Sequence, residues 1–308
     1  MGACAKGVHI SVMLAEAVDA LNVQPGGVFV DGTLGRAGHS MEILRRGGRV
    51  IGIDRDDDAL AAVENLKIDG IKAVKGNHGD VAKIVKSEGL ESVDGILLDL
   101  GVSSPQLDEG ERGFSFRSDG PLDMRMDRSC GLTAADIVRE FGEAELTEMF
   151  RTYGEEPNAR RIAKAIVKAR GDSPIVTTLG LAGLVERTLG RHGAHHPATR
   201  VFQALRMYVN DEMGELEKAL AGGIGCLKPG GRMVVITFES LTDRVVKRFF
   251  AAHAGRMVSL QQGGERWEGE LPRVAPVTRK AVVASAEEIA ANPRSRSAKM
   301  RAIERMVA

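Results

Sequence analysis

The chain has 308 residues, and its 42 basic and 42 acidic side chains give a formal net charge of zero. That length can form one large domain or two smaller ones. The even charge balance excludes a generally basic surface, so any contact with nucleic acid must come from local patches. Three scattered cysteines show neither metal-ligand spacing nor a disulfide framework, which indicates a reducing cytoplasm, and no apolar run reaches membrane-spanning length.

The first hundred residues alternate apolar strands with helices. Strands are predicted at Val28–Asp31, Arg49–Asp54, Ile71–Lys75 and Gly95–Asp99, and helices at Gly38–Arg46, Asp57–Leu66 and Val81–Glu88. Strands that are apolar almost throughout are typical of a parallel sheet with helices on both faces. The sequence therefore predicts an α/β fold with a doubly wound sheet.

The second part of the chain follows a different pattern. From residue 132 to about 220 the periodicity is helical, and strands return only at Met233–Phe238 and, near the edge of the sheet, at Val282–Ala284. We therefore expect a helical domain inserted after the fourth strand of the sheet. The expected limits are 1–107 and 212–308 for the sheet domain and 108–211 for the insert.

The stretch from Asp94 to Asp127 is the most unusual part of the chain. It begins as a buried strand that ends in Asp99, and it then continues without helical or strand periodicity. Its apolar side chains, such as Phe114 and Met124, are too many for a solvated coil. Because open α/β sheets bind ligands at the carboxyl ends of their strands, we expect this stretch to work at a ligand site.

A glycine-rich loop lies between the first strand and the first helix, with glycines at Gly32, Gly35 and Gly38. This spacing differs from the G-x-G-x-x-G fingerprint of dinucleotide-binding proteins. Asp31, at the strand tip, would repel a pyrophosphate, which favours a ligand with a cationic or hydroxylic part, such as the amino-acid portion of S-adenosylmethionine. Asp54 ends the second strand, where a carboxylate can bind a ribose diol, and Asp99 ends the fourth. The alternative is that the glycines only form a tight turn and that each carboxylate only caps the next helix or turn.

Longer motifs resemble one family across nearly the whole chain. They are HISVML from His9, VDGTLGRAGHS from Val30, DLGVSSPQLD from Asp99, RGFSF from Arg112, GPLDMRMD from Gly120, YGEEPNARRIAKAI from Tyr153, ATRVFQALRMYVNDE from Ala198, ITFESLTDRVVKRF from Ile236 and NPRSRSAKMR from Asn292. In these motifs the chain resembles the RsmH/MraW family, S-adenosylmethionine-dependent methyltransferases that act on N4 of a cytidine in the 16S rRNA of the small ribosomal subunit.

The resemblance implies a class I, Rossmann-like methyltransferase sheet with an inserted all-helical domain. It also implies S-adenosylmethionine as the cofactor and 16S rRNA in the small ribosomal subunit as the partner. The residues expected at the cofactor are Ala37, Gly38, His39, Asp54, His78, Asp99 and Gln106, beside Asp31 and Gly35 of the glycine-rich loop.

Four positions depart from the family pattern. Ala37 replaces a glycine, which predicts a slightly stiffer loop. His78 replaces a phenylalanine, and an imidazole can still stack on adenine but can also titrate. Glu239 and Thr242 replace a histidine and a glutamate, so the role of that histidine is not carried over to this chain.

The amino group of cytosine is a poor nucleophile because its lone pair is delocalised into the ring. An acceptor for an amino hydrogen would help to localise that lone pair. Where other amino-methylating enzymes carry a polar residue followed by prolines, this chain has Ser103-Ser104-Pro105, just after Asp99. We expect Asp99, Ser103 and Ser104 to be catalytic, with a backbone carbonyl of Ser103–Pro105 or the Ser104 hydroxyl as the acceptor. The alternative is that this tripeptide only shapes a turn.

Basic and aromatic side chains in three segments are candidates for RNA contact. A charged helix face is more often simply solvated, an aromatic pair in a loop often forms a small core, and a basic end segment is often a loose terminus. The candidates are Arg112, Phe114 and Arg117 in the long loop, Arg160, Arg161 and Lys164 on the amphipathic helix over 158–170, and Arg294 and Arg296 in the basic segment over 292–301.

Other functions are less consistent with the sequence. His192, His195 and His196 have no carboxylate or cysteine at metal-ligand spacing, so no metal is expected. A nicotinamide-dependent oxidoreductase on the same sheet is disfavoured by the glycine spacing and by the lack of a hydride partner. A non-catalytic RNA-binding or ribosome-assembly protein with a relic cofactor pocket remains an alternative because of Glu239 and Thr242.

Overall fold

The computed structural model describes residues 11–191, 196–259, 264–268 and 273–307. The chain divides into two compact units, which we describe separately: Met1–Gly101 with Gly214–Ala308, and Val102–Met213. The sheet unit ends at Gly101, earlier than the expected limit at residue 107, because the chain next forms the first helix of the other unit, α5 (Ser104–Asp108).

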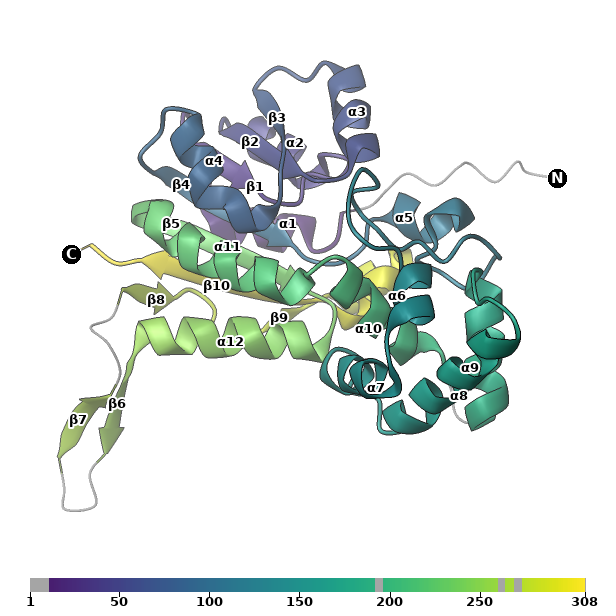
Figure 1. Cartoon of the computed structure of the whole chain (residues 1–308). Helices are drawn as coiled ribbons and strands as arrows, with labels where there is room; N and C mark the ends of the chain where they lie inside the picture. The colour runs from purple at the N-terminus through teal and green to yellow at the C-terminus, as the bar shows by residue number, and fades with distance from the viewer. Residues whose placement is uncertain (1–10, 192–195, 260–263, 269–272, 308) are drawn as a thin grey trace. The chain divides into compact units, whose positions relative to one another are not determined.

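The sheet unit is built on one mixed sheet with strand order β3-β2-β1-β4-β5-β10-β8 (Figure 1). Strands β1 to β5 are mutually parallel, whereas β10 runs antiparallel to β5, β8 and β9. This confirms the predicted Rossmann-like α/β class. The strands are β1 (Val28–Asp31), β2 (Arg49–Asp54), β3 (Ile71–Lys75), β4 (Val93–Asp99), β5 (Leu227–Thr237), β8 (Val274–Pro276), β9 (Val282–Val283) and β10 (Lys299–Arg305).

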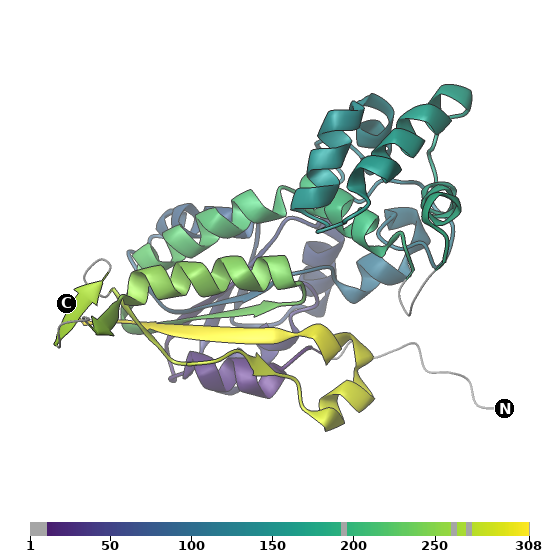
Figure 2. The ribbon, with the colours of Figure 1, turned by 90° about the horizontal axis from the view of Figure 1, so that it is seen from below.

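Helices cover both faces of this sheet, as the apolar strands predicted. Figure 2 shows α1 on one face and α11 and α12 on the other. Neighbouring residues of one strand enter opposite cores: Leu97 packs with α1, whereas Leu98 packs with α4 and α11. The helices are α1 (Leu14–Leu21), α2 (Gly38–Arg45), α3 (Asp57–Leu66), α4 (Val81–Ser87), α11 (Glu212–Cys226), α12 (Ser240–Ala254) and α13 (Ala286–Ala291), with 3-10 turns η1 (His78–Asp80) and η3 (Pro293–Ser297).

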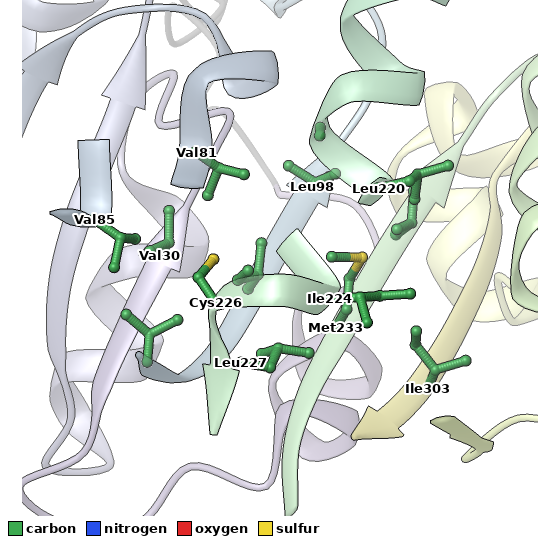
Figure 3. Packing of buried hydrophobic residues seen from close by; sticks show 14 of the residues in the cluster. Val30, Val81, Val85, Leu98, Leu220, Ile224, Cys226, Leu227, Met233 and Ile303 are labelled. Atoms are coloured by element: carbon green, nitrogen blue, oxygen red, sulfur yellow. The ribbon is translucent and has the colours of Figure 1, made fainter. Parts of the chain in front are cut away.

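The larger core lies between the sheet and the α4–α11–α12 face. Figure 3 shows Val30, Leu98 and Met233 from three strands meeting Val81 of α4 and Ile224 of α11. These side chains are fully buried or nearly so. Burial of this kind stabilises by about 25 cal/mol per Å² of apolar surface, and it holds the strand tips, where the polar residues lie, in fixed positions.

The segment that was expected to be a basic tail is instead part of the sheet. Residues 292–301 form η3 and the first half of β10, where Met300 and Ala302 are buried. Arg301 donates a hydrogen bond to Asp243 of α12, so the positive charge of Arg301 is neutralised within the sheet unit. The alternative of a loose terminus is therefore excluded for this segment, because alternating small and apolar residues there complete the sheet. A hairpin of β6 (Arg256–Ser259) and β7 (Glu265–Glu268) was also not expected.

The second unit is helical, as the periodicity predicted. Its core includes Leu146, Phe150, Ile162, Ile166 and Leu205, all fully or almost fully buried. The unit contains α5, η2 (Gly110–Arg112), α6 (Ala134–Glu140), α7 (Glu143–Thr152), α8 (Ala159–Asp172), α9 (Thr178–Leu189) and α10 (Thr199–Val209). In neither unit is any helix of the described residues long and apolar enough to cross a membrane.

Candidate cofactor-binding site

Three carboxylates end three neighbouring parallel strands. Asp31 ends β1, Asp54 ends β2 and Asp99 ends β4, and the sheet order places β1 between the other two. The chain reverses its winding direction between β1 and β4. In open α/β sheets ligands bind at the carboxyl ends of the strands at this switch point. The topology therefore brings together the three acidic residues that the sequence singled out.

Backbone hydrogen bonds attach the loop after β1 to both flanking strands. The Gly32 N–H donates to the Leu97 carbonyl over 2.9 Å, and the Leu34 N–H donates to the Ile53 carbonyl over 3.0 Å. The Gly35 N–H donates to Asp54 Oδ2 over 2.8 Å. These bonds hold the glycine-rich loop as a rigid bridge across the strand tips.

Two positions in this loop need a left-handed backbone, and a third leaves no room for a side chain. Gly35 has φ +50°, and Ala37 has φ +61° although it is not glycine. A Cβ at Gly38 would lie 1.9 Å from Ser11 Oγ, so any side chain there would force Ser11 to move. The stiffer loop expected from Ala37 thus corresponds to a strained conformation at the N-terminus of α2.

Asp31 and Asp54 are held by hydrogen bonds although burial opposes their charge. Asp31 Oδ2 accepts from Ser40 Oγ over 2.7 Å, and Asp54 Oδ1 accepts from the Asp56 N–H over 2.9 Å. Burial raises the pKa of both carboxyls, and the hydrogen bonds that they accept only partly offset it. Ser40 was not among the expected site residues, although it closes the VDGTLGRAGHS motif.

The pKa of the Asp99 carboxyl is raised in the same direction as the pKa values of Asp31 and Asp54. Burial raises the pKa of Asp99 to about 6; the neighbouring His39 lowers the value and Asp31 raises it further. Its Oδ1 is buried and has no hydrogen-bond partner among the described residues. Its Oδ2 lies 3.9 Å from His39 Nδ1. A buried carboxylate oxygen without a partner is a candidate ligand contact, because an unsatisfied polar atom is costly.

His78 follows β3 and begins the turn η1. Burial, with a smaller effect from Arg55, lowers its pKa to about 3. The imidazole is therefore neutral near neutral pH, and the titration that its chemistry allows does not occur there. Its buried Nε2 has no partner among the described residues, so it could accept a hydrogen bond from a ligand or stack on one.

These features fit S-adenosylmethionine. The cofactor carries a sulfonium and an ammonium group, and three carboxylates in one place favour cations. The loop with Gly35 and Gly38 lets the chain approach a ligand closely. Two buried polar atoms, His78 Nε2 and Asp99 Oδ1, have no hydrogen-bond partner among the described residues and could bind the ligand. The residues that could hold the cofactor are Asp31, Gly35, Ala37, Gly38, His39, Asp54, His78 and Asp99 of the sheet unit.

The remaining expected residues of the reaction lie at the start of the helical unit. Ser103 is the N-cap of α5 and forms a capping box with Gln106: Gln106 Oε1 accepts from the Ser103 N–H over 3.0 Å, and Ser103 Oγ accepts from the Gln106 N–H over 3.4 Å. For Ser103, the geometry therefore agrees with the alternative that the Ser103–Pro105 tripeptide shapes a turn. Ser104 is the first residue of α5, and Gln106 is buried.

Two candidates for RNA contact are buried in the helical unit. Phe114 belongs to its apolar core, and Arg112, 3 % exposed, donates to the Met126 carbonyl over 3.1 Å. The guanidinium also lies over the Phe114 ring, 5.9 Å from its centre. Their burial favours the alternative that these two side chains form the core of the unit itself. Arg117 is exposed.

The basic residues of α8 surround a hollow in the helical unit. Its volume is about 520 Å³, and it is lined by Glu143, Pro157, Asn158, Arg160, Arg161 and Lys164. Arg160 pairs with Glu143, with Nε 3.3 Å from Oε1. The three expected RNA contacts of this helix therefore line one surface. Arg294 and Arg296 are exposed on η3 of the sheet unit.

The described residues show no cluster of three or more histidine, cysteine, aspartate or glutamate side chains suited to a metal. His192 and His195 lie outside the described residues, and His196 Nε2 is 3.6 Å from Glu186. Of the two departures near α12, Glu239 precedes the helix as its N-cap residue and Thr242 lies on it and is buried; the neighbouring Asp243 bonds Arg301.

The sheet order and the acidic strand tips around a glycine-rich loop fit an S-adenosylmethionine-dependent methyltransferase, and the family of the chain is of this class. The chain belongs to the MraW methylase family, whose model matches residues 6–306. It is 48% identical to "Ribosomal RNA small subunit methyltransferase H" of Symbiobacterium thermophilum, over 97% of each chain. The protein of the same name from Trichlorobacter lovleyi is 47% identical, over 97% of this chain and 98% of its own.

Proposed function

We propose that the protein transfers the methyl group of S-adenosylmethionine to N4 of a cytidine in the 16S rRNA of the small ribosomal subunit. The observation that carries this proposal is the acidic switch point formed by Asp31, Asp54 and Asp99, which suits a cationic methyl donor. The names of the relatives support small-subunit rRNA as the substrate. The choice of cytidine N4 rests on the resemblance of the motif over Asp99–Asp108.

The bound cofactor supplies an electrophilic methyl group, and the protein must align it with the amino nitrogen for an in-line displacement. The peptide from Asp99 to Pro105 is the proposed source of an acceptor for an amino hydrogen. Because Ser103 Oγ caps α5, we place this acceptor at the Ser104 hydroxyl or at a backbone carbonyl of Ser103–Pro105. Hydrogen bonding there concentrates the nitrogen lone pair and stabilises the positive charge that develops on it.

The hollow on α8 is the proposed contact for RNA phosphates. Arg161 and Lys164 line it, and Arg160 is held there by Glu143. Phosphate contacts fix the register of an RNA without reading its sequence. A local cationic surface of this kind would let the protein bind RNA although the chain has no net charge.

The direct test is methyl transfer from labelled S-adenosylmethionine to small ribosomal subunits from cells that lack this protein, with naked 16S rRNA as a second substrate. Nucleoside mass spectrometry then identifies the product. We expect N4-methylcytidine with the wild type, and a single-turnover rate that falls in both Asp99→Asn and Ser104→Ala. Label at another atom, or no label on either substrate, would overturn the proposal. An unchanged rate in both variants would remove these residues from the reaction.

A further inference from the structure

Charge is distributed unevenly along this chain, although its total is zero. Residues 240–308 contain 13 lysines and arginines against 7 acidic residues, whereas residues 1–101 contain 11 against 15. The first segment includes α12 and the strands β8, β9 and β10, and the second forms the strands from β3 to β4 at the other side of the sheet. On that other side, Asp57, Asp58 and Glu64 of α3 are exposed. The sheet unit therefore has a basic side and an acidic side.

The outer face of α12 carries a basic stripe. Arg244, Lys247 and Arg248 are exposed, and their spacing of i, i+3 and i+4 places them on one side of the helix. The opposite side packs into the core of the sheet unit through Val246 and Phe250. Because the burial of that apolar side fixes the rotation of α12, the basic stripe faces solvent.

The carboxylate nearest in sequence to this stripe is already paired with other cations. Asp243 Oδ1 lies 2.7 Å from Arg301 Nε, and Asp243 Oδ2 lies 3.4 Å from Lys299 Nζ, both on β10. One buried carboxylate thus faces two cations inside the unit. Lys247 and Arg248 form no hydrogen bond or ion pair with another of the described residues, so their charges are available to a partner from solution.

The edge of the sheet adds further cations beside α12. β8 and β9 pair with β10, and the loop between them carries Arg279 and Lys280, both exposed. Thr278 holds this loop on β10: its N–H donates to the Ala302 carbonyl over 3.1 Å, and its Oγ1 accepts from the Ala302 N–H over 2.9 Å. α12 packs on β8 and β10 and runs along β10 (Figure 2). Arg296 is exposed on η3, just before β10 begins.

This basic side adjoins the strand tips of the candidate site. β5 is the parallel neighbour of β4, with Ile236 in register beside Asp99. The helix α12 begins at Ser240, directly after the tip of β5, so the basic stripe starts within one or two helical turns of the carboxyl edge of the sheet. A polyanion that reaches the tip of β4 is attracted by this side and repelled by the acidic side at α3.

We propose that this basic side, the α12 surface, binds the phosphate backbone of the substrate RNA, so that the RNA extends from the strand tips over the β5–β10 side of the sheet. This inference rests on the proposed function and adds a second contact to the hollow on α8, which belongs to the other unit. The α12 surface consists of Arg244, Lys247, Arg248, Arg279, Lys280 and Arg296.

The chemistry of the α12 surface favours RNA over a lipid membrane. Four of its six cations are arginines, whose planar guanidinium matches phosphate oxygens. A helix that binds in the plane of a membrane inserts an apolar face, but the apolar face of α12, with Val246 and Phe250, is buried in the core. Contacts to phosphates alone position an RNA and do not read its sequence.

Binding of naked 16S rRNA at several salt concentrations, with S-adenosylhomocysteine present, tests the α12 surface. In Lys247→Gln with Arg248→Gln, the slope of log K against log salt should fall by about 1.4 in magnitude, for two phosphate contacts on a single strand. Arg279→Gln with Lys280→Gln should lower it by a similar amount. The matched control is Lys83→Gln with Lys86→Gln on α4, which removes the same charge and should keep the wild-type slope.

Two results of these titrations would overturn the proposal. An unchanged slope in both variants of the α12 surface would mean that its cations are only solvated, and an equal fall in the control would assign the effect to net charge. Vesicles that contain phosphatidylglycerol test the other polyanion. If the variants lose vesicle binding but keep wild-type RNA binding, the surface is a membrane contact and the proposal fails.

Photocrosslinking gives a readout of position that does not depend on affinity. A photoreactive phenylalanine analogue in place of Arg248 should crosslink to 16S rRNA, and the same analogue in place of Lys83 should not. No crosslink from position 248 would contradict the proposal. None of these measurements uses methyl transfer. A protein that crosslinks from position 248 but methylates no cytidine would therefore contradict only the proposed function, and N4-methylation without RNA contact at the α12 surface would contradict only this inference.

Discussion

The backbone N–H of Asp99 donates to Thr33 Oγ1 over 2.7 Å, and this bond ties the tip of β4 to the loop after β1. We expect Thr33→Val, which keeps the shape and removes the acceptor, to destabilise the protein by about 1–3 kcal/mol, because a buried N–H loses its partner. Thr33→Ser keeps the hydroxyl and should cost less. Urea unfolding measures both. Binding of S-adenosylmethionine should weaken in Thr33→Val alone, and equal weakening in both variants would count against the role of this bond.

The three carboxylates should make the free protein less stable as pH rises. The pKa of Asp99 is about 6 in the folded chain, against an ordinary value of 3.8. Its favourable contribution is complete below pH 3.8 and is lost as pH rises through 6, by up to about 2–3 kcal/mol. The pKa values of Asp31 and Asp54 are raised in the same direction. Thermal unfolding from pH 5 to 8 measures the trend.

Asp99→Asn is the matched variant for this pH effect. An amide has no charge to bury, so the variant without cofactor should be more stable than the wild type at pH 7.5, and its stability should depend less on pH. The same variant should bind S-adenosylmethionine far more weakly. A pH profile that is unchanged by the substitution would show that Asp99 is not the group that titrates.

The sequence predicted the strands whose tips form the site. Asp31, Asp54 and Asp99 each follow an apolar run, and such a run forms a buried strand because of its local composition. It did not predict β10. That strand carries charged residues between its apolar ones, and its charge is neutralised by Asp243, a residue distant in sequence. Burial of Arg112 was missed for the same reason, since its carbonyl acceptors become visible only in the folded unit. The formation of β10 and the burial of Arg112 both depend on contacts between residues that are distant in sequence, and local sequence patterns do not show such contacts.

Ala37 offers a test of backbone strain in the cofactor loop. Its φ of +61° costs about 1–2 kcal/mol for a residue with a Cβ, but its methyl group is fully buried beside Leu34 and Leu60. Ala37→Gly relieves the strain and loses the methyl contact, so the free energy of unfolding should change by less than about 1 kcal/mol. Ala37→Val should lose more than about 2 kcal/mol, because a β-branched side chain fits neither the backbone nor the space. Comparable losses in both variants would mean that packing, and not φ, dominates this position.

If the hollow on α8 binds RNA phosphates, substitutions of its basic residues should weaken the salt dependence of RNA binding. In the double variant Arg161→Gln with Lys164→Gln, the slope of log K against log salt should fall by about 1.4 in magnitude, two phosphate contacts on a single strand. Glu143→Gln should strengthen binding, since it removes the carboxylate that pairs with Arg160. The control is the same double change at Lys83 and Lys86, which are exposed on α4 of the sheet unit. An equal loss in this control would assign the effect to net charge alone.

The pair between Asp243 on α12 and Arg301 on β10 should titrate in the opposite direction to Asp99. Arg301 Nε lies 2.7 Å from Asp243 Oδ1, and both side chains are largely buried. Burial acts to raise the pKa of Asp243, but the bonds and charges of Arg301 and Lys299 outweigh it and leave the pKa lowered. The stability that this group contributes is therefore present above pH 3.8 and is lost as pH falls through its lower folded value.

Asp243→Asn leaves a buried guanidinium without its counter-ion, so we expect a loss of about 3 kcal/mol at pH 7. The matched control is Glu304→Gln on the same strand. Glu304 Oε2 lies 2.8 Å from Arg232 Nε, but its side chain is 38 % exposed, so solvent screens this pair and its loss should cost less than about 1 kcal/mol. Chemical unfolding of both variants decides the matter. If Glu304→Gln costs as much as Asp243→Asn, burial is not what gives the Asp243 pair its strength.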